Sequence, residues 1–300
     1  MKKIIFTFVV AVASCYHASA QLLYKISGND LEKPSYVVGI HQLAPAAMAQ
    51  LVNGVSEALN GTDQLYSELN VDAATADASQ TVKSASTLPD GKTIQQILSA
   101  DELKRFNAFL TKTQGQDLRN RVLAEKVEHK KPSALSKEMK IWLYLANHRG
   151  SYDPTSSMDS YFIRLAKKNN MPVYGFETVE EYAEVIYNAS TEERQKQQLV
   201  SLIDNQEFYQ QQMDNILNGY MLQDINAVEN ALNQKVGGNG DATAEEVEKQ
   251  NARIAGWSQK IQEVAKKTPT LFVVGVEKLP GQQGLLQLLS QAGYTVEGLK

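Results

Sequence analysis

The sequence predicts an α/β fold with a long helical insertion between its two halves. Near the C-terminus, Thr270–Gly298 has the pattern of a buried strand, a loop with Pro280-Gly281, a Leu-rich helix and a closing strand. Near the start, Ser35–Pro45 repeats the order of two valines, a glycine, three variable residues and a leucine. Most of the chain between these two phrases has helical periodicity.

The repeated phrase suggests that two strand ends meet at one site. A loop that leaves the C-terminal end of a buried strand is where α/β proteins usually place their chemistry. The alternative is that a short strand-plus-glycine phrase recurs by chance, since a short motif is only a hypothesis.

Residues 1–20 have the pattern of a signal peptide. Lys2-Lys3 precedes the apolar run Ile4–Ala13, and Ala18-Ser19-Ala20 forms a small-residue cleavage site. The apolar run is too short to cross a bilayer as a helix. Cleavage would leave 21–300 as a single domain that is exported to the periplasm or secreted.

Cys15 offers a second interpretation of the leader. Val12-Ala13-Ser14-Cys15 resembles a bacterial lipobox, which would make Cys15 a lipid-anchored N-terminus. Cleavage after Ala20 is favoured because the Ala-Ser-Ala site is cleaner. That cleavage would remove the only cysteine, and the mature chain would then have no disulfide and no thiolate.

Composition and motifs exclude several classes of function. The net charge is −4, and removal of the leader with its two lysines makes it about −6. No basic stripe with interleaved aromatic residues occurs, so nucleic acid is not an expected partner. The sequence has no Ser-His-Asp order, P-loop, dinucleotide glycine fingerprint or HExxH motif.

The first quarter of the mature chain predicts a hairpin, a helix and a third strand. Leu22–Ile26 and Tyr36–Val38 are the hairpin strands, joined by turn residues in Ser27–Pro34. Ala46–Leu59 is a small, apolar helix. Gln64–Leu69 is the next strand, and its alternation leaves every second side chain on the same face.

The middle of the chain is expected to be mainly helical. Val71–Leu88 is rich in Ala, Ser and Thr and is interpreted as a mobile or loosely helical connection. Met171–Phe176 is one further strand. The Gln- and Glu-rich helix 191–222 is interpreted as a solvated outer face. The other expected helices are 93–128 with a break near 115, 131–147, 157–169, 179–188, 224–232 and 245–267.

Five phrases spread along the mature chain carry a resemblance to a known family. They are LLYKISGNDLEKPSYVVG, QLYSEL, MDSYFIRLAKKNNMPVYGFETVEEYAEVI, RIAGW and LFVVGVEKLPGQQGLLQLLSQAGYTVEG. In order and spacing they resemble the TraB/GumN family, relatives of the Tiki proteins. The resemblance implies mixed sheets with an internally duplicated core, covered by helices. For active members it also implies a metal-dependent, peptidase-like site.

The family pattern of each corner is a glycine, two residues and a histidine, and this chain departs from it twice. The first glycine corresponds to Gly39, and the histidine position is Gln42. The second glycine corresponds to Gly275, and the histidine position is Lys278. The resemblance therefore implies a catalytically impaired member, a pseudoenzyme.

Three other positions match the family pattern. Glu68 corresponds to the acidic residue that ends the second core strand, and Glu177 to the acid of a GLET-like phrase. Arg253 corresponds to the arginine four residues before a tryptophan, although Ile254 replaces the asparagine that normally follows it. Arg253 could clamp a substrate carboxylate or form a helix-surface ion pair, for example with Glu177.

The two replaced histidines weaken any metal site. A hydrolytic divalent-metal site needs imidazole or carboxylate ligands and an open position for water. Gln42 offers a weak carbonyl ligand. At an effective dielectric constant near 20, the Lys278 ammonium about 4 Å from a divalent ion is repelled by roughly 8 kcal/mol. An ion pair between Lys278 and Glu68 could fill the position instead.

A residual metal site remains the alternative. His41, Glu68 and Glu277 could hold Mn, Co or Zn, whereas the simpler interpretation makes His41 a lone histidine. The favoured hypothesis is an exported protein that binds a peptide, a small ligand or an envelope protein. The alternatives are a residual metal-dependent peptidase-like hydrolase and a structural envelope protein that uses its Gln-rich helices as a contact surface.

Overall fold

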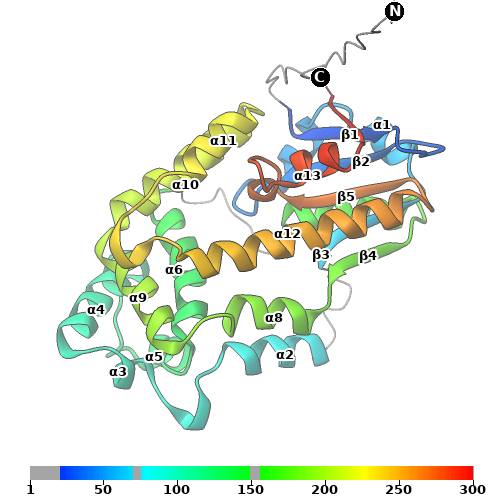
Figure 1. Ribbon diagram of the computed structural model, residues 1–300. Helices are drawn as coiled ribbons and strands as arrows, with labels where there is room; N and C mark the ends of the chain where they lie inside the picture. Colours follow the sequence, from blue (N-terminus) through cyan, green and yellow to red (C-terminus); the bar gives the residue numbers. More distant parts are fainter. Residues whose placement is uncertain (1–20, 70–75, 149–155, 300) are drawn as a thin grey trace, which may run out of the picture.

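The computed structural model describes residues 21–69, 76–148 and 156–299, and the predicted signal peptide lies outside them. The described residues form one six-stranded mixed sheet with strand order β4-β3-β5-β2-β1-β6 (Figure 1). The strands are β1 (Leu23–Ser27), β2 (Ser35–Ile40), β3 (Gln64–Leu69), β4 (Val173–Glu177), β5 (Thr270–Gly275) and β6 (Thr295–Gly298).

Four neighbouring strands of this sheet run in the same direction. β2 pairs in parallel with β5, β5 with β3, and β3 with β4. β1 pairs antiparallel with both β2 and β6, so the hairpin predicted from the sequence is present. The C-terminal ends of β2, β5, β3 and β4 therefore lie along one edge of the sheet.

The two strands that carry the repeated phrase are direct neighbours. In their register Gly39 lies opposite Val274, and Ile40 lies opposite Gly275. The loops that follow β2 and β5 therefore start side by side, as the repeated phrase predicts. This parallel pair is compatible with the internally duplicated core that the resemblance implies.

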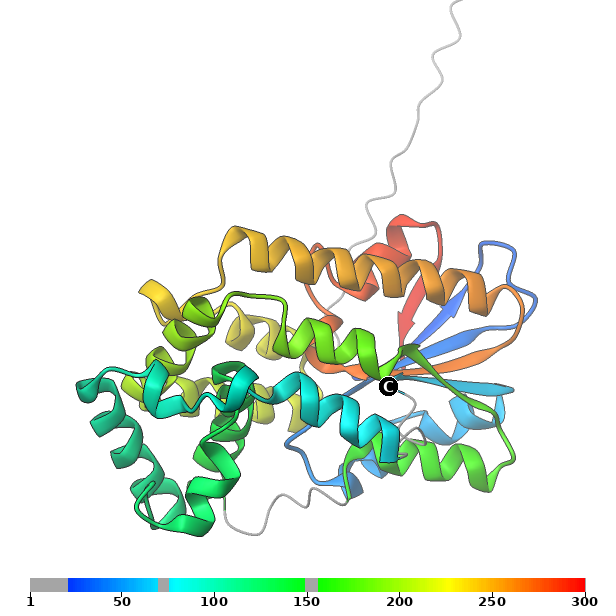
Figure 2. The ribbon, with the colours of Figure 1, turned by 90° about the horizontal axis from the view of Figure 1, so that it is seen from below.

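Helices cover both faces of the sheet (Figure 2). α12 (Ala244–Ala265) lies on one face together with α13 (Leu285–Gln291), whereas α1 (Val55–Asn60) and α7 (Met158–Lys168) lie on the other. The main core joins these helices to the sheet through fully buried side chains. Examples are Val37, Val38, Leu65, Phe162, Ile261, Leu271 and Phe272.

A helical arm extends from the sheet and has a core of its own (Figure 1). That second core packs α4, α6 and α9 around Phe106, Leu110, Leu143, Leu199 and Leu202. No helix among the described residues is both long and apolar enough to cross a membrane. The helices of the arm are α2 (Ala76–Ser86), α3 (Ile94–Ile97), α4 (Ala100–Gln114), α5 (Arg121–Val127), α6 (Pro132–Asn147), α8 (Val179–Tyr187), α9 (Glu192–Asp204), α10 (Gln206–Met221) and α11 (Ile225–Leu232).

The helix predicted over Ala46–Leu59 is wrong as a single element. The structure has a 3₁₀ helix, η1 (Ala46–Leu51), followed by α1. Gly54 separates them with φ = 79°, a left-handed conformation that disfavours most side chains. A Cβ on Gly54 would also come within 3.1 Å of Leu23. The glycine is therefore the N-cap residue at which α1 begins.

The Gln-rich segment 191–222 also differs from its prediction. It breaks at Asn205 into α9 and α10, and α9 is not simply a solvated face. Leu199 and Leu202 of α9 are fully buried in the second core. Gln195 is only 4% exposed, and its amide donates to the carbonyl oxygens of Tyr187 and Ser190. The composition of the segment alone did not predict that one side of α9 is buried.

Part of the segment that was predicted as a mobile or loosely helical connection forms the helix α2. Its residues Ala76–Ser86 form a regular helix that packs against α8. A small third cluster made of Ala134, Ala183 and Tyr187, with Val82 packed against it, joins α2, α6 and α8. Residues 71–75 of the predicted connection lie outside the described part of the chain.

Candidate functional site

The C-terminal ends of the parallel strands bring most of the predicted site residues to one edge of the sheet. Glu68 is the second-last residue of β3, and Glu177 is the last residue of β4. His41 follows β2 directly. Glu277 and Lys278 lie in η5 (Val276–Lys278), the short 3₁₀ helix that follows β5.

Lys278 lies at the centre of a charged cluster that we define as Glu68, Asp159, Glu277 and Lys278. Its side chain is only 8% exposed, and its Nζ lies 2.9 Å from Glu68 Oε1 and 2.5 Å from Glu277 Oε1. The ion pair with Glu68 that the sequence suggested is therefore present. Burial acts to lower the pKa of Lys278, but the two carboxylates outweigh burial and raise that pKa above its ordinary value.

The two carboxylates that face Lys278 are held differently. Glu68 Oε1 also accepts the backbone N–H of Gly275 at 2.6 Å, which ties β3 to the end of β5. Glu277 is 44% exposed and belongs to the same turn as Lys278. Burial acts to raise the pKa of Glu277, whereas the adjacent ammonium lowers it, and the net direction is down.

Asp159 completes the cluster and was not predicted as a site residue from the sequence, which indicated only a helix over 157–169. In the structure the cap of α7 is the Ser157 hydroxyl, which accepts the Ser160 N–H. Burial and then the Glu68 charge raise the pKa of Asp159 to about 6, although Lys278 acts in the opposite direction. The only local signal was an acidic residue in the first turn of a helix.

His41 lies beside the cluster and has an unsatisfied ring nitrogen. Its Nε2 is buried and has no hydrogen-bond partner among the described residues. Its ring lies 5.7 Å from the ring of Tyr220, whose hydroxyl donates to the Gly39 carbonyl. Burial lowers the pKa of His41 to about 4, although Glu277 acts to raise it. The imidazole is therefore neutral at pH 7.

Glu177 and Arg253 form a second, separate ion pair. Arg253 Nε and Nη2 donate to the two carboxylate oxygens of Glu177 at 2.5 and 2.7 Å, and Trp257 Nε1 donates to one of them at 3.0 Å. Their side chains are 11% and 9% exposed, so the pair is buried rather than on a helix surface. A substrate carboxylate would have to displace Glu177 to reach the same guanidinium edge.

Trp257 connects the two ion pairs. The Arg253 guanidinium lies 4.9 Å and the Lys278 ammonium 5.5 Å from the centre of its ring. Phe176, next to Glu177, stacks on the ring at 5.1 Å. Cations over an aromatic face are stabilised by the quadrupole of the ring, so this indole contributes to both pairs.

Gln42 differs from the other predicted residues. Its side chain is exposed, and among the residues that the structure describes it makes no hydrogen bond. The two replaced histidine positions are therefore not equivalent, because Lys278 is inside the charged cluster and Gln42 is not joined to it.

The residues present do not fit a divalent metal ion as they are arranged. The Lys278 ammonium uses the carboxylate oxygens of Glu68 and Glu277 that a cation would need, and its raised pKa keeps it charged. A hard metal ion requires such oxygens at about 2.0–2.6 Å. Within the described ranges, no group of three or more His, Cys, Asp or Glu side chains has an arrangement that could hold a metal.

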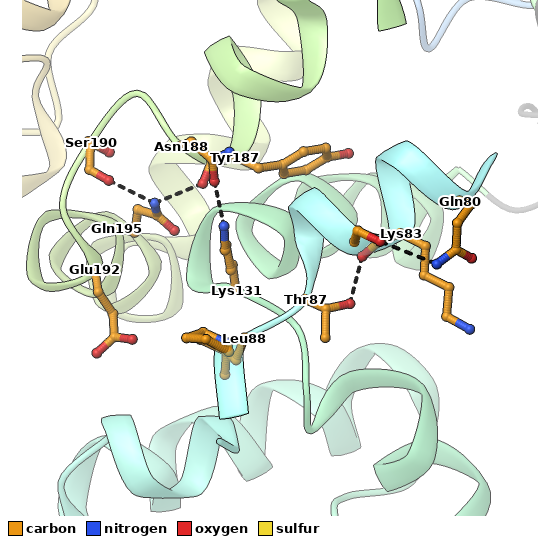
Figure 3. A pocket seen from close by; sticks show the side chains of 12 residues that line it. Gln80, Lys83, Thr87, Leu88, Lys131, Tyr187, Asn188, Ser190, Glu192 and Gln195 are labelled. Atoms are coloured by element: carbon orange, nitrogen blue, oxygen red, sulfur yellow. Dashed lines mark hydrogen bonds between the residues drawn. The ribbon is translucent and has the colours of Figure 1, made fainter. Parts of the chain in front are cut away.

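Two cavities lie in the helical arm, and one of them reaches the end of β3. One, of about 570 Å³, is lined by residues of α2, α6 and α8, and by Leu69 at the end of β3. The other, of about 720 Å³, is lined by mainly polar side chains (Figure 3). In Figure 3, Lys131 reaches the side-chain oxygen of Asn188, and Gln195 reaches the carbonyl oxygen of Ser190.

Comparison with known proteins gives a match to a family model. The family model described as TraB/PrgY/gumN matches residues 22–298, which include the sheet, the helical arm and every residue of the charged cluster. No curated protein and no solved structure matches the chain.

Proposed function

The chain belongs to the TraB/PrgY/gumN family, and from this membership we propose that it is an exported, catalytically impaired member. In this proposal the protein binds a peptide, a small ligand or an envelope protein at the C-terminal edge of its sheet. It no longer holds the metal ion that the resemblance implies for active relatives.

The position of Lys278 is the observation that carries this proposal. The resemblance assigns a histidine to this position, and here an ammonium lies between Glu68 and Glu277. A fixed cation at this point neutralises the carboxylates and repels a second cation. It supplies neither a Lewis acid nor an activated water. Gln42, at the other histidine position, is a second replacement that weakens metal binding.

Export is proposed from the leader sequence alone. Residues 1–20 have the charged start, apolar run and small-residue end of a signal peptide. Fractionation of the native host followed by mass determination of the intact protein tests this. A periplasmic or secreted chain that begins at Gln21 supports cleavage, whereas a membrane-associated chain that begins at a lipid-modified Cys15 supports the anchored alternative.

Metal calorimetry tests the central proposal. The exported protein is titrated with Mn²⁺, Co²⁺ and Zn²⁺, in parallel with the His41→Ala variant. We expect no saturable heat that depends on His41. Binding of one metal ion per chain that the His41→Ala change abolishes would overturn the proposal.

One observation favours a second candidate, a residual metal-dependent peptidase-like hydrolase. His41 is neutral at pH 7 and has a buried Nε2 without a partner among the described residues, as a ligand would need. In this candidate His41, Glu68 and Glu277 hold the ion after the Lys278 ammonium has moved away. Peptide hydrolysis that requires Mn²⁺, Co²⁺ or Zn²⁺, stops with a chelator and is lost in His41→Ala would establish it.

A further inference from the structure

The two cavities of the helical arm meet and differ in character. Lys83 and Tyr187 line both of them, so the cavities share a wall. The cavity next to the sheet has a largely apolar wall, made of Leu69, Val82, Ala134, Ile141 and Val179. The other cavity is bordered mainly by amide, hydroxyl and charged groups, among them Gln80, Ser84, Thr87, Asn188 and Glu192 (Figure 3).

The described residues that line the apolar cavity carry more positive than negative charge. They include three lysines and one glutamate, namely Lys83, Lys130, Lys137 and Glu138. Lys130 is paired with Glu138, and the Lys137 ammonium contacts the Tyr182 hydroxyl. The whole chain has a net charge of −4, so this local excess does not reflect a generally basic protein.

Lys83 differs from the other two lysines of the wall. It is exposed on α2, and its ammonium has no ion-pair or hydrogen-bond partner among the described residues. It stands where the apolar and the polar cavity meet. A flexible lysine can keep its charge in water while its methylene groups cover apolar surface, so it is suited to hold an anionic group at the mouth of an apolar pocket.

We propose that the paired cavities bind an amphipathic anion with a single acyl chain. The acyl chain occupies the apolar cavity, the anionic group lies at Lys83, and any further polar part of the head group enters the polar cavity. The volume of about 570 Å³ is in the usual range for small-molecule sites, which are mostly apolar with a few placed polar groups. The charge complementarity favours an anion over a neutral or cationic chain.

This site is distinct from the charged cluster at the sheet edge. It is built mainly from α2, α6, α8 and α9, and its lining includes none of the side chains of the charged cluster. The proposal therefore holds whether or not the cluster binds a metal, and the metal calorimetry described above cannot decide it.

Binding of matched twelve-carbon chains to the exported protein tests the proposal. Dodecanoate, dodecanol and dodecyltrimethylammonium are compared below their micelle concentrations, by displacement of a fluorescent fatty acid. We expect saturable binding of dodecanoate at one site, and binding of the cationic chain that is weaker by about tenfold or more. A lysophospholipid with an anionic head, tested in parallel, shows whether the polar cavity adds affinity.

Two substitutions locate the site. Lys83→Glu reverses the charge at the shared wall, and we expect it to weaken dodecanoate binding by about tenfold or more without weakening dodecanol. Val82→Trp fills the apolar cavity and should weaken both chains. Lys104→Glu is the matched control, because Lys104 is an exposed lysine on α4 that lines neither cavity.

Three results would overturn the proposal. The first is equal affinity for dodecanoate and dodecyltrimethylammonium, and the second is no saturable binding of any chain. The third is unchanged dodecanoate binding in the Lys83→Glu variant. Because Lys83 is exposed, this substitution is not expected to impair folding, so the test remains valid even if Val82→Trp does.

Discussion

The Nζ of Lys278 lies 2.9 Å from Oε1 of Glu68. Glu68 lies near the end of β3, and Lys278 lies in η5, directly after the neighbouring parallel strand β5. The Lys278 ammonium and the Glu68 carboxylate each stabilise the charge of the other in a position that is largely shielded from water. Removing one partner of a buried pair leaves an uncompensated charge, which typically costs about 3–5 kcal/mol. The pair therefore contributes to the stability of the sheet edge as well as to the character of the site.

Lys278→Ala should lower the free energy of unfolding by about 2–3 kcal/mol at pH 7. The effect is below that of a fully buried pair, because Glu277 is 44% exposed and water can solvate it. Urea unfolding followed by circular dichroism measures the change. Lys104→Ala, an exposed change on α4, should shift stability by less than about 0.5 kcal/mol. An equal effect of both variants would contradict the role given to Lys278.

The same Lys278→Ala variant should gain affinity for divalent cations. Without the ammonium, Glu68 and Glu277 leave two carboxylates close to the neutral imidazole of His41. A ligand that binds only the folded state raises its stability in proportion to RT ln(1 + [L]/Kd). We expect Mn²⁺ or Zn²⁺ to raise the melting temperature of the variant and not that of the wild type. If neither ion raises the melting temperature of the variant, this edge of the sheet is not a former metal site.

Asp159→Asn should make the protein more stable above about pH 6. The folded pKa of Asp159 is about 6 and its ordinary value is 3.8, so the folded state holds the proton more tightly between these values. Stability therefore falls as pH rises through this window, and the penalty is complete above it and absent below pH 3.8.

The Asn side chain cannot ionise. The free energy of unfolding of the variant should therefore rise relative to that of the wild type by about 2–3 kcal/mol as the pH goes from 4 to 7. The charged groups that act on Asp159 are Glu68, Glu277 and Lys278. Urea unfolding at several pH values measures the difference between the two proteins. A difference that is constant with pH would refute the role of the ionised carboxylate.

Arg253→Met should destabilise the fold by about 3–5 kcal/mol, because Glu177 would remain buried without its counter-ion. Changing both residues, as in Arg253→Met with Glu177→Leu, should recover part of this loss, since no buried charge then remains. Arg121→Met is a suitable control, because the Arg121–Glu125 pair is exposed. Chemical denaturation of the wild type, Arg253→Met, Glu177→Leu and the double variant gives the coupling free energy, and a coupling near zero would contradict this account.

Local sequence patterns predicted the strands and the meeting of their ends. The β-branched runs that end at Gly39 and Gly275 are local signals, and their repetition correctly placed β2 beside β5. The pairing of Lys278 with Glu68 was instead suggested by the family resemblance, which assigns both positions to one site. The inferences about the strands succeeded because a strand and its end are encoded within a few residues.

Features that depend on packing between distant segments were not predicted. The raised pKa of Asp159 reflects burial and the charge of Glu68, neither of which leaves a pattern near residue 159. Gln195 is buried and bonds to carbonyl oxygens at the end of α8 and in the loop before α9, although composition places it on a solvated helix. The break at Gly54 depends on its left-handed φ and on the close approach of Leu23.

Glu68 is held by the N–H of Gly275 as well as by Lys278. The main chain of the neighbouring strand thus fixes this anion independently of its counter-ion. As such proteins diverge, a single replacement in the turn after β5 can therefore change which cation pairs with Glu68 without displacing the carboxylate. A change of activity at this edge of the sheet would then leave the backbone fold intact.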